Sequence, residues 1–200
     1  MLLARSEPGA GKECRVRSVC VFCGSAMGAK AEYERVAAAL GRAIARRGLT
    51  LVYGGAHVGL MGMVADAALA GGGRVTGVIP TSLVNRELAH MSVNDLRVVA
   101  SMHERKNLMA SLSDAFVSLP GGVGTLDELF EMLTWTQLGF HAKPCAIVDV
   151  DGYFAPLLKF LDGAADAGFV HRPCLDSLLV DTCVERALDR CAAFGAHAVS

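Results

Sequence analysis

Seven short apolar runs recur along this sequence, and the segments between them are long enough to form helices. The runs, rich in Val, Ile, Phe and Cys, cover residues 19–23, 50–53, 74–79, 96–100, 115–119, 145–150 and 178–180. Several are apolar at nearly every position, as parallel strands covered on both faces are. Helix-like segments cover residues 31–47, 60–70, 102–112, 126–138, 154–167 and 182–194. This alternation predicts an α/β fold, a Rossmann-like doubly wound parallel sheet of about seven strands with helices on both faces.

No linker interrupts the alternation, so we expect one nucleotide-binding domain over residues 16–200 and a flexible tail over residues 1–15. A chain of 200 residues fits a single core. One irregular segment, residues 80–94, holds the polar cluster Asn85-Arg86-Glu87 and is longer than an ordinary connection. Such segments are usually functional or mobile.

Charge and hydropathy exclude several classes of protein. With 19 Lys and Arg against 20 Asp and Glu, the formal charge is −1, which leaves no positive surplus for gripping a nucleic acid. The N-terminus has no apolar segment of the length an export signal needs. The longest charge-poor segment, residues 56–73, is broken by Asp66 and several glycines, so it does not read as a membrane span. We therefore expect a cytoplasmic protein with neither nucleic acid nor membrane as its partner.

The seven cysteines follow no disulfide framework. Cys20 and Cys23 fit a C-x-x-C pattern, but they lie in an expected strand, where positions i and i+3 face opposite sides. We expect no metal site and interpret the cysteines as small buried hydrophobes.

Glycine-rich loops follow several of the expected strands. In an open parallel sheet, ligands bind beyond the carboxyl ends of the strands, which is where these loops lie. The loop of residues 120–128, Pro-Gly-Gly-Val-Gly-Thr-Leu-Asp-Glu, lets the backbone approach a ligand while the N–H groups of the next helix point at it. Gly54-Gly55 repeats this arrangement more weakly, and Ser25 in the first loop is a candidate phosphate or ribose contact. No loop has the G-x-G-x-x-G spacing, so a mononucleotide or sugar phosphate is favoured over a dinucleotide.

Two Ser/Thr-x-x-Glu patterns fit the capping box that closes a helix N-terminus. Ser101 with Glu104 is one, and we expect Glu104 to be only a cap. Thr125 with Glu128 is the other, but a carboxylate beside a phosphate loop would face like charge unless a cation intervenes.

Arg105 and Lys106 can supply that cation, because their helix starts at the neighbouring loop if the two preceding strands are adjacent. A carboxylate, an Arg and a phosphate seat suit glycosidic bond cleavage, which develops an oxocarbenium-like centre. The Arg would hold the phosphate or orient the acid.

Two motifs together resemble the LONELY GUY (LOG) family of cytokinin riboside 5′-monophosphate phosphoribohydrolases. Residues 120–128 fit the PGGxGTxxE signature and residues 102–106 fit the MHxRK pattern. The similarity runs from about residue 18 to residue 182 and includes the segments 53–55, 133–139 and 149–154. The resemblance implies hydrolysis of the N-glycosidic bond of N6-modified adenosine monophosphates, or AMP itself, to free base and ribose 5-phosphate. It implies no cofactor and a homodimer, in some members a larger assembly, with the active site near the subunit interface.

Carried onto this sequence, the family's catalytic pair falls on Arg105 and Glu128. Residues expected to contact the substrate, from the resemblance or from the loops, are Glu87, Lys106, Gly121, Gly122, Val123, Gly124, Thr125, Thr134, Gly54, Gly55 and Ser25. Asp127 stands where many members have Glu, which keeps a carboxylate. Val123 stands where plant members tend to have Tyr, as suits a bacterial-type member.

Two other functions are weighed against hydrolysis. Members of the family have often been labelled lysine decarboxylases, but that chemistry relies on a pyridoxal-binding Lys. Lys106 lies in the arginine motif and Lys143 precedes a strand, so neither is an obvious candidate. A non-catalytic carrier or sensor of a nucleotide or nucleotide-bearing cofactor is the main alternative, since fold does not fix function. Such a carrier would not need both Arg105 and Glu128.

Overall fold

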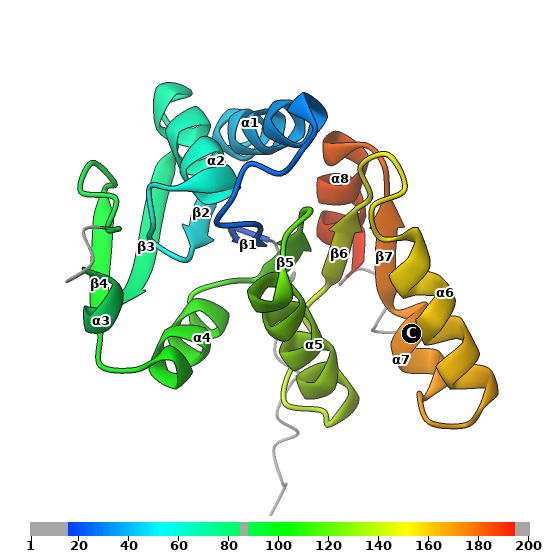
Figure 1. Cartoon of the computed structure of the whole chain (residues 1–200). Coiled ribbons are helices and arrows are strands. Elements are labelled where there is room, and N and C mark those ends of the chain that lie inside the picture. Colours follow the sequence, from blue (N-terminus) through cyan, green and yellow to red (C-terminus); the bar gives the residue numbers. More distant parts are fainter. Residues whose placement is uncertain (1–15, 85–87, 195–200) are drawn as a thin grey trace, which may run out of the picture.

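A computed structural model describes residues 16–84 and 88–194 as one sheet flanked by helices. The expected tail, residues 1–15, lies outside the described residues. In the described ranges, seven strands pair in parallel in the order β4-β3-β2-β1-β5-β6-β7 (Figure 1). They are β1 (Ser18–Phe22), β2 (Thr50–Tyr53), β3 (Arg74–Pro80), β4 (Asp95–Val99), β5 (Ala115–Ser118), β6 (Cys145–Val148) and β7 (Leu178–Asp181). The predicted fold class and the seven expected strands are confirmed.

The helices are α1 (Ala31–Arg46), α2 (Gly59–Ala70), α3 (Thr81–Val84), α4 (Met102–Ser111), α5 (Val123–Gln137), α6 (Ala155–Asp166), α7 (Arg172–Asp176) and α8 (Val184–Phe194). Six of them match predicted helices to within about three residues. The other two, α3 and α7, are single turns, which are too short for hydrophobic periodicity to reveal. None of the helices in the described ranges has the length and apolar character needed to cross a bilayer.

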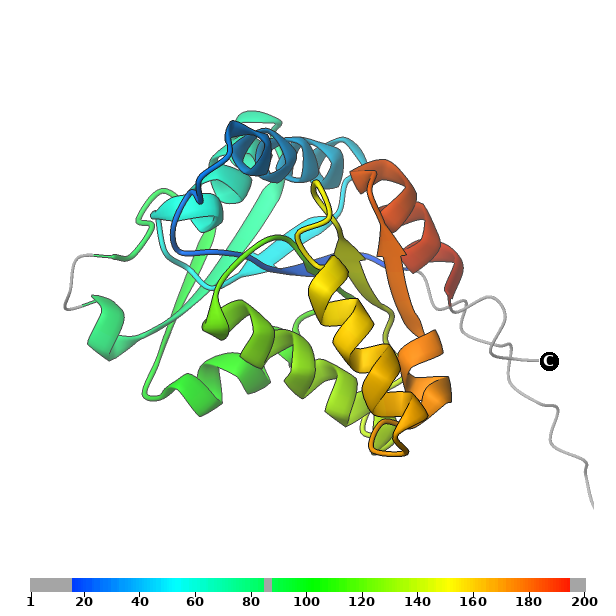
Figure 2. The same ribbon diagram turned by 45° about the vertical axis from the view of Figure 1, so that its right-hand side comes forward.

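The helices form a layer on each face of the sheet. One face is covered by α1, α2 and α8, and the other by α4, α5, α6 and α7 (Figures 1 and 2). Successive residues of β1 alternate between the two cores: Val19 and Val21 pack under α1 and α2, whereas Cys20 and Phe22 pack under α4 and α5. Cys23 belongs to the first core and Cys20 to the second, so the two thiols lie on opposite faces, as expected.

The strand order reverses between β1 and β5, and this switch point is where α/β folds bind ligands. The first-strand loop and the fifth-strand loop touch there, because the N–H of Gly24 donates to the carbonyl of Pro120 at 3.0 Å. A Cβ on Gly121 would collide with the Thr125 hydroxyl and would lie 2.7 Å from the nitrogen of Gly24. Only glycine permits this close approach of the two loops.

The strands that precede α4 and α5 are not adjacent, so the condition under which the sequence would bring Arg105 to Glu128 is not met. β4 is an edge strand, and β3, β2 and β1 separate it from β5. The two helices nevertheless meet, because the chain leaves the edge strand and crosses one face of the sheet as α4 before it forms β5. This crossover places α4 beside α5 on the same face (Figure 1).

Candidate active site

A cavity of about 450 Å³ opens at the carboxyl ends of β1, β2 and β5. Its walls come from the loops after β1 and β2, from the segment around α3, and from the first turns of α4 and α5. The lining residues are Cys23, Ser25, Ala56, Val58, Met61, Leu83, Leu88, Met102, Arg105, Gly122, Val123, Gly124, Thr125, Asp127 and Glu128. Both residues of the expected catalytic pair therefore face one cavity, at the place that the fold predicts for a ligand.

Arg105, at the end of the first turn of α4, is only 7% exposed and is fixed by the ends of two strands. Its Nε donates to the carbonyl of Val78 at 3.1 Å, and its Nη2 donates to the carbonyl of Gly54 at 2.9 Å. A Cβ on Gly54 would collide with Nη2. Gly54 therefore makes room for the guanidinium.

Gly54 and Gly55 do not line the cavity, although both were expected to contact the substrate. Gly55 has a φ of +74° and accepts a hydrogen bond from the N–H of His90 at 2.9 Å. In this structure the two glycines build the wall behind Arg105.

Glu128, in the second turn of α5, is 9% exposed, and its Oε1 lies 3.6 Å from Nη1 of Arg105. Burial raises the pKa of Glu128 to about 7, even though the charge of Arg105 opposes this shift. Asp127 adds to the rise in pKa. A carboxyl group that titrates near neutral pH can exchange protons with a substrate or a water molecule.

Thr125 and Glu128 do not form the capping box that their spacing fits. Helix α5 begins at Val123, with the extended residue Gly122 as its N-cap, so Thr125 lies inside the first turn and is buried. Threonine is a usual N-cap residue, but the flexible glycines at positions 122 and 124 let the helix begin before Thr125. Glu128 is therefore not engaged in closing the helix.

Glu104 does cap its helix, as predicted. The hydroxyl of Ser101, the N-cap of α4, accepts from the N–H of Glu104 at 3.1 Å. The Glu104 carboxylate accepts from the N–H of Ala100 at 2.8 Å, one residue before the usual position.

The N-terminus of α5 forms an anion seat within the cavity. The first backbone hydrogen bond of this helix runs from the N–H of Leu126 to the carbonyl of Gly122 at 3.1 Å. The N–H groups of Val123, Gly124 and Thr125 precede that bond, and all three residues line the cavity. The positive end of the helix dipole lies there too, so a phosphate group suits the position.

Lys106 turns away from this cavity. Its Nζ lies 3.0 Å from a carboxylate oxygen of Asp127 and 3.1 Å from one of Glu131, and the residue does not line the cavity. Burial alone would lower the pKa of Lys106, but the hydrogen bonds to these two carboxylates outweigh that effect and raise it. The side chain thus ties α4 to α5 and keeps Arg105 opposite Glu128.

Three other expected contacts have different placements. Glu87 lies outside the described residues. Thr134 is exposed on α5, about 9 Å further along the helix axis than Glu128 at 1.5 Å per residue, and does not line the cavity. Gly121 lines a smaller neighbouring cavity of about 270 Å³. Ser25, Gly122, Val123, Gly124 and Thr125 join Arg105 and Glu128 in the main cavity.

The sequence did not reveal the apolar wall formed by Leu83 and Leu88. The carbonyl of Leu88 accepts from the N–H of His57 at 3.0 Å, next to an isolated antiparallel bridge between Ala56 and Ala89. The ring of His90 contacts Asp66 of α2 at 3.0 Å. These contacts between distant segments leave no local signal in the sequence.

Fold and cavity together define a class of protein, the Rossmann-like α/β proteins with a ligand cavity at the switch point. Within that class, this site has a buried acid with a raised pKa beside a guanidinium, an arrangement typical of catalytic sites.

Comparisons with known proteins narrow the class to one family. A family model described as possible lysine decarboxylase matches residues 61–191. The LOG cytokinin riboside 5′-monophosphate phosphoribohydrolase of Oryza sativa subsp. japonica is 51% identical over 159 residues, which are 80% of this chain and 66% of that protein. The enzyme of that name from Rhodococcoides fascians is 50% identical over 86% of this chain and 87% of its own length. LOG3 of Arabidopsis thaliana is 49% identical over 80% of this chain and 74% of its own.

The chain belongs to the LOG family of cytokinin riboside 5′-monophosphate phosphoribohydrolases, as the two sequence motifs predicted. The matched segment spans slightly less than two thirds of the length of the rice relative.

Solved structures with lower sequence similarity share the fold. The molybdenum cofactor carrier protein of Chlamydomonas reinhardtii superposes with a TM-score of 0.69 at 23% identity, over 91% of this chain and 99% of that one. The molybdenum cofactor binding protein of Rippkaea orientalis gives 0.66 at 23% identity, over 88% and 94%. At this level of identity, the two structures show only that this chain shares its fold with proteins named for cofactor binding.

Proposed function

We propose that this protein hydrolyses the N-glycosidic bond of adenosine 5′-monophosphates, including those substituted at N6. The products are the free base and ribose 5-phosphate. The observation that carries the proposal is the 3.6 Å contact between Arg105 and Glu128 in the same cavity as the N-terminus of α5. The names of the relatives, which share about half of their residues with this chain, support the same substrate class.

The phosphate binds first in this account, and it fixes the position of the sugar. The N–H groups of Val123, Gly124 and Thr125 receive the 5′-phosphate. Binding energy from this remote group holds the anomeric carbon against Glu128 and so accelerates the reaction at that carbon.

Glu128 then acts at the anomeric carbon. Its ionised form stabilises the oxocarbenium-like centre that forms as the bond to the base breaks, or accepts a proton from the attacking water. The water oxygen bonds to the anomeric carbon, the base leaves with the electron pair of the C–N bond, and a proton passes to the base. Because the pKa of Glu128 is raised to about 7 by burial, both protonation states are populated at neutral pH.

Arg105 remains a cation throughout, since its guanidinium does not act as a base at neutral pH. Two of its nitrogens are already committed to the carbonyls of Val78 and Gly54. The remaining one, Nη1, faces Glu128 and keeps part of the carboxyl population ionised.

Decarboxylation of lysine receives no support from the placement of Lys106 and Lys143. Lys106 is paired with Asp127 and Glu131, and Lys143 donates from Nζ to the carbonyl of Ala110 at 2.8 Å. Neither residue lines the cavity. A Schiff-base lysine would have to lie within it.

The protein in this proposal is a cytoplasmic homodimer. Met102 and Val123 line the cavity yet are 46% and 84% exposed, and a second subunit placed over this rim would bury them. The six cysteines of the described ranges are free thiols, as suits a reducing compartment. Light scattering that gives a monomer with full activity would contradict the dimer.

The experiment that tests the reaction is incubation of the purified protein with AMP and with isopentenyladenosine monophosphate. Chromatography should show free adenine or isopentenyladenine in step with ribose 5-phosphate. The matched inactive control is Glu128→Gln. Binding of these nucleotides without any release of base would instead favour a carrier or sensor.

A further inference from the structure

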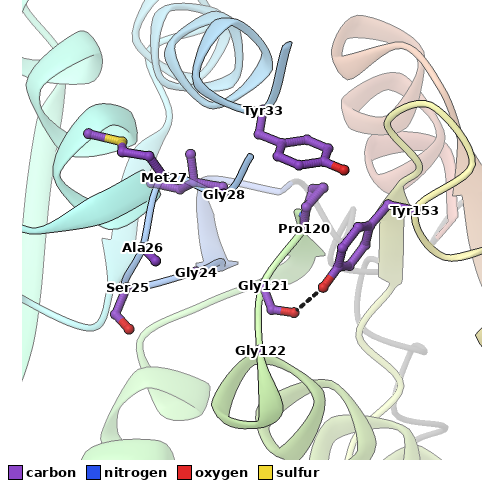
Figure 3. Close-up of a pocket in the computed structure, with 11 residues that line it drawn as sticks. Gly24, Ser25, Ala26, Met27, Gly28, Tyr33, Pro120, Gly121, Gly122 and Tyr153 are labelled. Atoms are coloured by element: carbon purple, nitrogen blue, oxygen red, sulfur yellow. Dashed lines mark hydrogen bonds between the residues drawn. The ribbon is translucent and has the colours of Figure 1, made fainter. Parts of the chain in front are cut away.

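A second cavity, of about 270 Å³, lies on the other side of the loop that carries the anion seat. It is lined by residues 24–28, Tyr33, Leu60, residues 120–122 and Tyr153 (Figure 3). Ser25 and Gly122 line both cavities. The loop is therefore a thin wall with the catalytic pair on one side and two tyrosine rings on the other.

Tyr153 forms a hydrogen bond to the backbone of this loop. Its hydroxyl donates to the carbonyl of Gly121 at 2.6 Å, and Figure 3 shows the carbonyl directed at this hydroxyl. Tyr153 belongs to the segment 149–154, which resembles the family but which the proposed reaction leaves without a role.

The hydrogen bond to Gly121 also sets the direction of the next N–H group. The Gly121 carbonyl and the Gly122 N–H belong to one planar trans peptide, in which they point in opposite directions. The N–H of Gly122 therefore points away from the Tyr153 hydroxyl. In the view of Figure 3, Ser25 and Tyr153 lie on opposite sides of the loop. Gly122 is the N-cap of α5, so this N–H adjoins those of the anion seat.

We propose that Tyr153 is a positioning residue for the phosphate, because its hydroxyl fixes the Gly121–Gly122 peptide with the N–H facing the substrate. The inference rests on the proposed function, in which the N-terminus of α5 binds the phosphate. It adds that Tyr153, from outside the main cavity, holds the backbone of this phosphate site in place. Without the bond, the same peptide can turn its carbonyl oxygen toward the anion, which replaces an attraction by a repulsion.

The peptide needs such a support because glycine gives little restraint of its own. Gly122 has no side chain to restrict its backbone dihedrals, and even an added Cβ would meet no atom within 4 Å. The bond from Gly24 to Pro120 holds the preceding peptide and leaves the one after Gly121 free.

Tyr153 itself is held rigidly. It ends a tight turn in which Asp151 has a φ of +52°, a strained value for a residue other than glycine. A carboxylate oxygen of Asp149 closes the turn by accepting from the N–H of Phe154 at 2.8 Å. The Tyr153 ring packs edge-on against Phe154, with centroids 5.0 Å apart, and against Tyr33 at 5.7 Å. A rigid donor is what a positioning role requires.

The test compares Tyr153→Phe with Tyr33→Phe. Each variant removes one hydroxyl from a tyrosine of the same small cavity, but only Tyr153 has a hydrogen bond to the loop. Calorimetry would measure the dissociation constants of ribose 5-phosphate, which carries the phosphate, and of adenosine, which lacks it. We expect Tyr153→Phe to weaken binding of ribose 5-phosphate about five-fold, as the loss of one hydrogen bond does, and to leave adenosine binding unchanged. Tyr33→Phe should change neither constant.

An unchanged affinity of Tyr153→Phe for ribose 5-phosphate would overturn the inference, as would equal weakening of both ligands, which marks a general structural effect. The proposed hydrolysis is tested separately, with the wild-type protein. A wild-type protein that binds ribose 5-phosphate but releases no base from AMP would contradict the proposed function and leave the role of Tyr153 measurable by binding.

Discussion

Nη1 of Arg105 lies 3.6 Å from Oε1 of Glu128, close enough for electrostatic attraction and too far for a hydrogen bond. The guanidinium is anchored by Val78 and Gly54, so it cannot close this gap without losing the carbonyl contacts. The carboxylate therefore keeps its oxygens available to a substrate while it remains beside a cation. Burial outweighs the attraction of Arg105, and the pKa of Glu128 is raised to about 7.

Glu128→Gln removes the charge and keeps the shape of the side chain. We expect kcat to fall by about 10² to 10⁴-fold, the usual contribution of a positioned acid or base. Steady-state release of adenine from AMP measures this loss. Glu104→Gln is the matched control, because Gln also serves in a capping box, and it should keep wild-type activity. Full activity in Glu128→Gln would deny that residue a part in the reaction.

The same substitution changes how stability depends on pH. Burial raises the pKa of Glu128 from 4.5 to about 7, so the native state disfavours the ionised form. This cost is absent below the unfolded-state pKa of 4.5, grows as the pH rises from there, and is complete above about pH 7. Glu128→Gln should therefore match the wild type near pH 4.5 and be more stable at pH 8, by at most about 3 kcal/mol. Urea unfolding at the two pH values measures the difference, and equal stability at pH 8 would refute the raised pKa.

Gly54→Ala tests the anchoring of Arg105. The added methyl group would collide with Nη2, so the guanidinium must move away from the Gly54 carbonyl. We expect a loss of about 1 to 3 kcal/mol in stability, as overpacking usually costs, together with a loss of activity larger than ten-fold. Gly163→Ala in α6 is the control, since nothing lies within 4 Å of its added Cβ and alanine favours helices. Denaturant unfolding and kcat/KM for AMP should separate the two variants, and similar values for both would contradict the anchoring role.

The sequence predicted the layout of this fold well because apolar runs and glycine loops are local features. The five inner strands of the parallel sheet are buried on both faces, which makes them nearly uniformly apolar and easy to recognise. The start of α5 was misplaced because Thr125 has the residue type of an N-cap, whereas Gly122 caps this helix through its backbone alone.

Arg105 and Glu128, the expected catalytic pair, do meet, but not by the route that the sequence suggested. The motifs identified Arg105 and Glu128, but their contact comes from the path of α4 across the sheet and does not need adjacent strands. Lys106, which was expected to contact the substrate, has its side chain paired with two carboxylates of α5 in this structure. The walls formed by Leu88 and Tyr153 depend on contacts between distant segments, which no local pattern encodes.

The ratio of kcat/KM for AMP to that for adenosine tests the central claim most directly, because the two substrates differ only in the 5′-phosphate. If the N-terminus of α5 holds the phosphate and so places the anomeric carbon against Glu128, the ratio should exceed about 10³, with most of the loss in kcat. Equal turnover of AMP and adenosine would contradict the account, because the phosphate seat would then contribute nothing to the reaction.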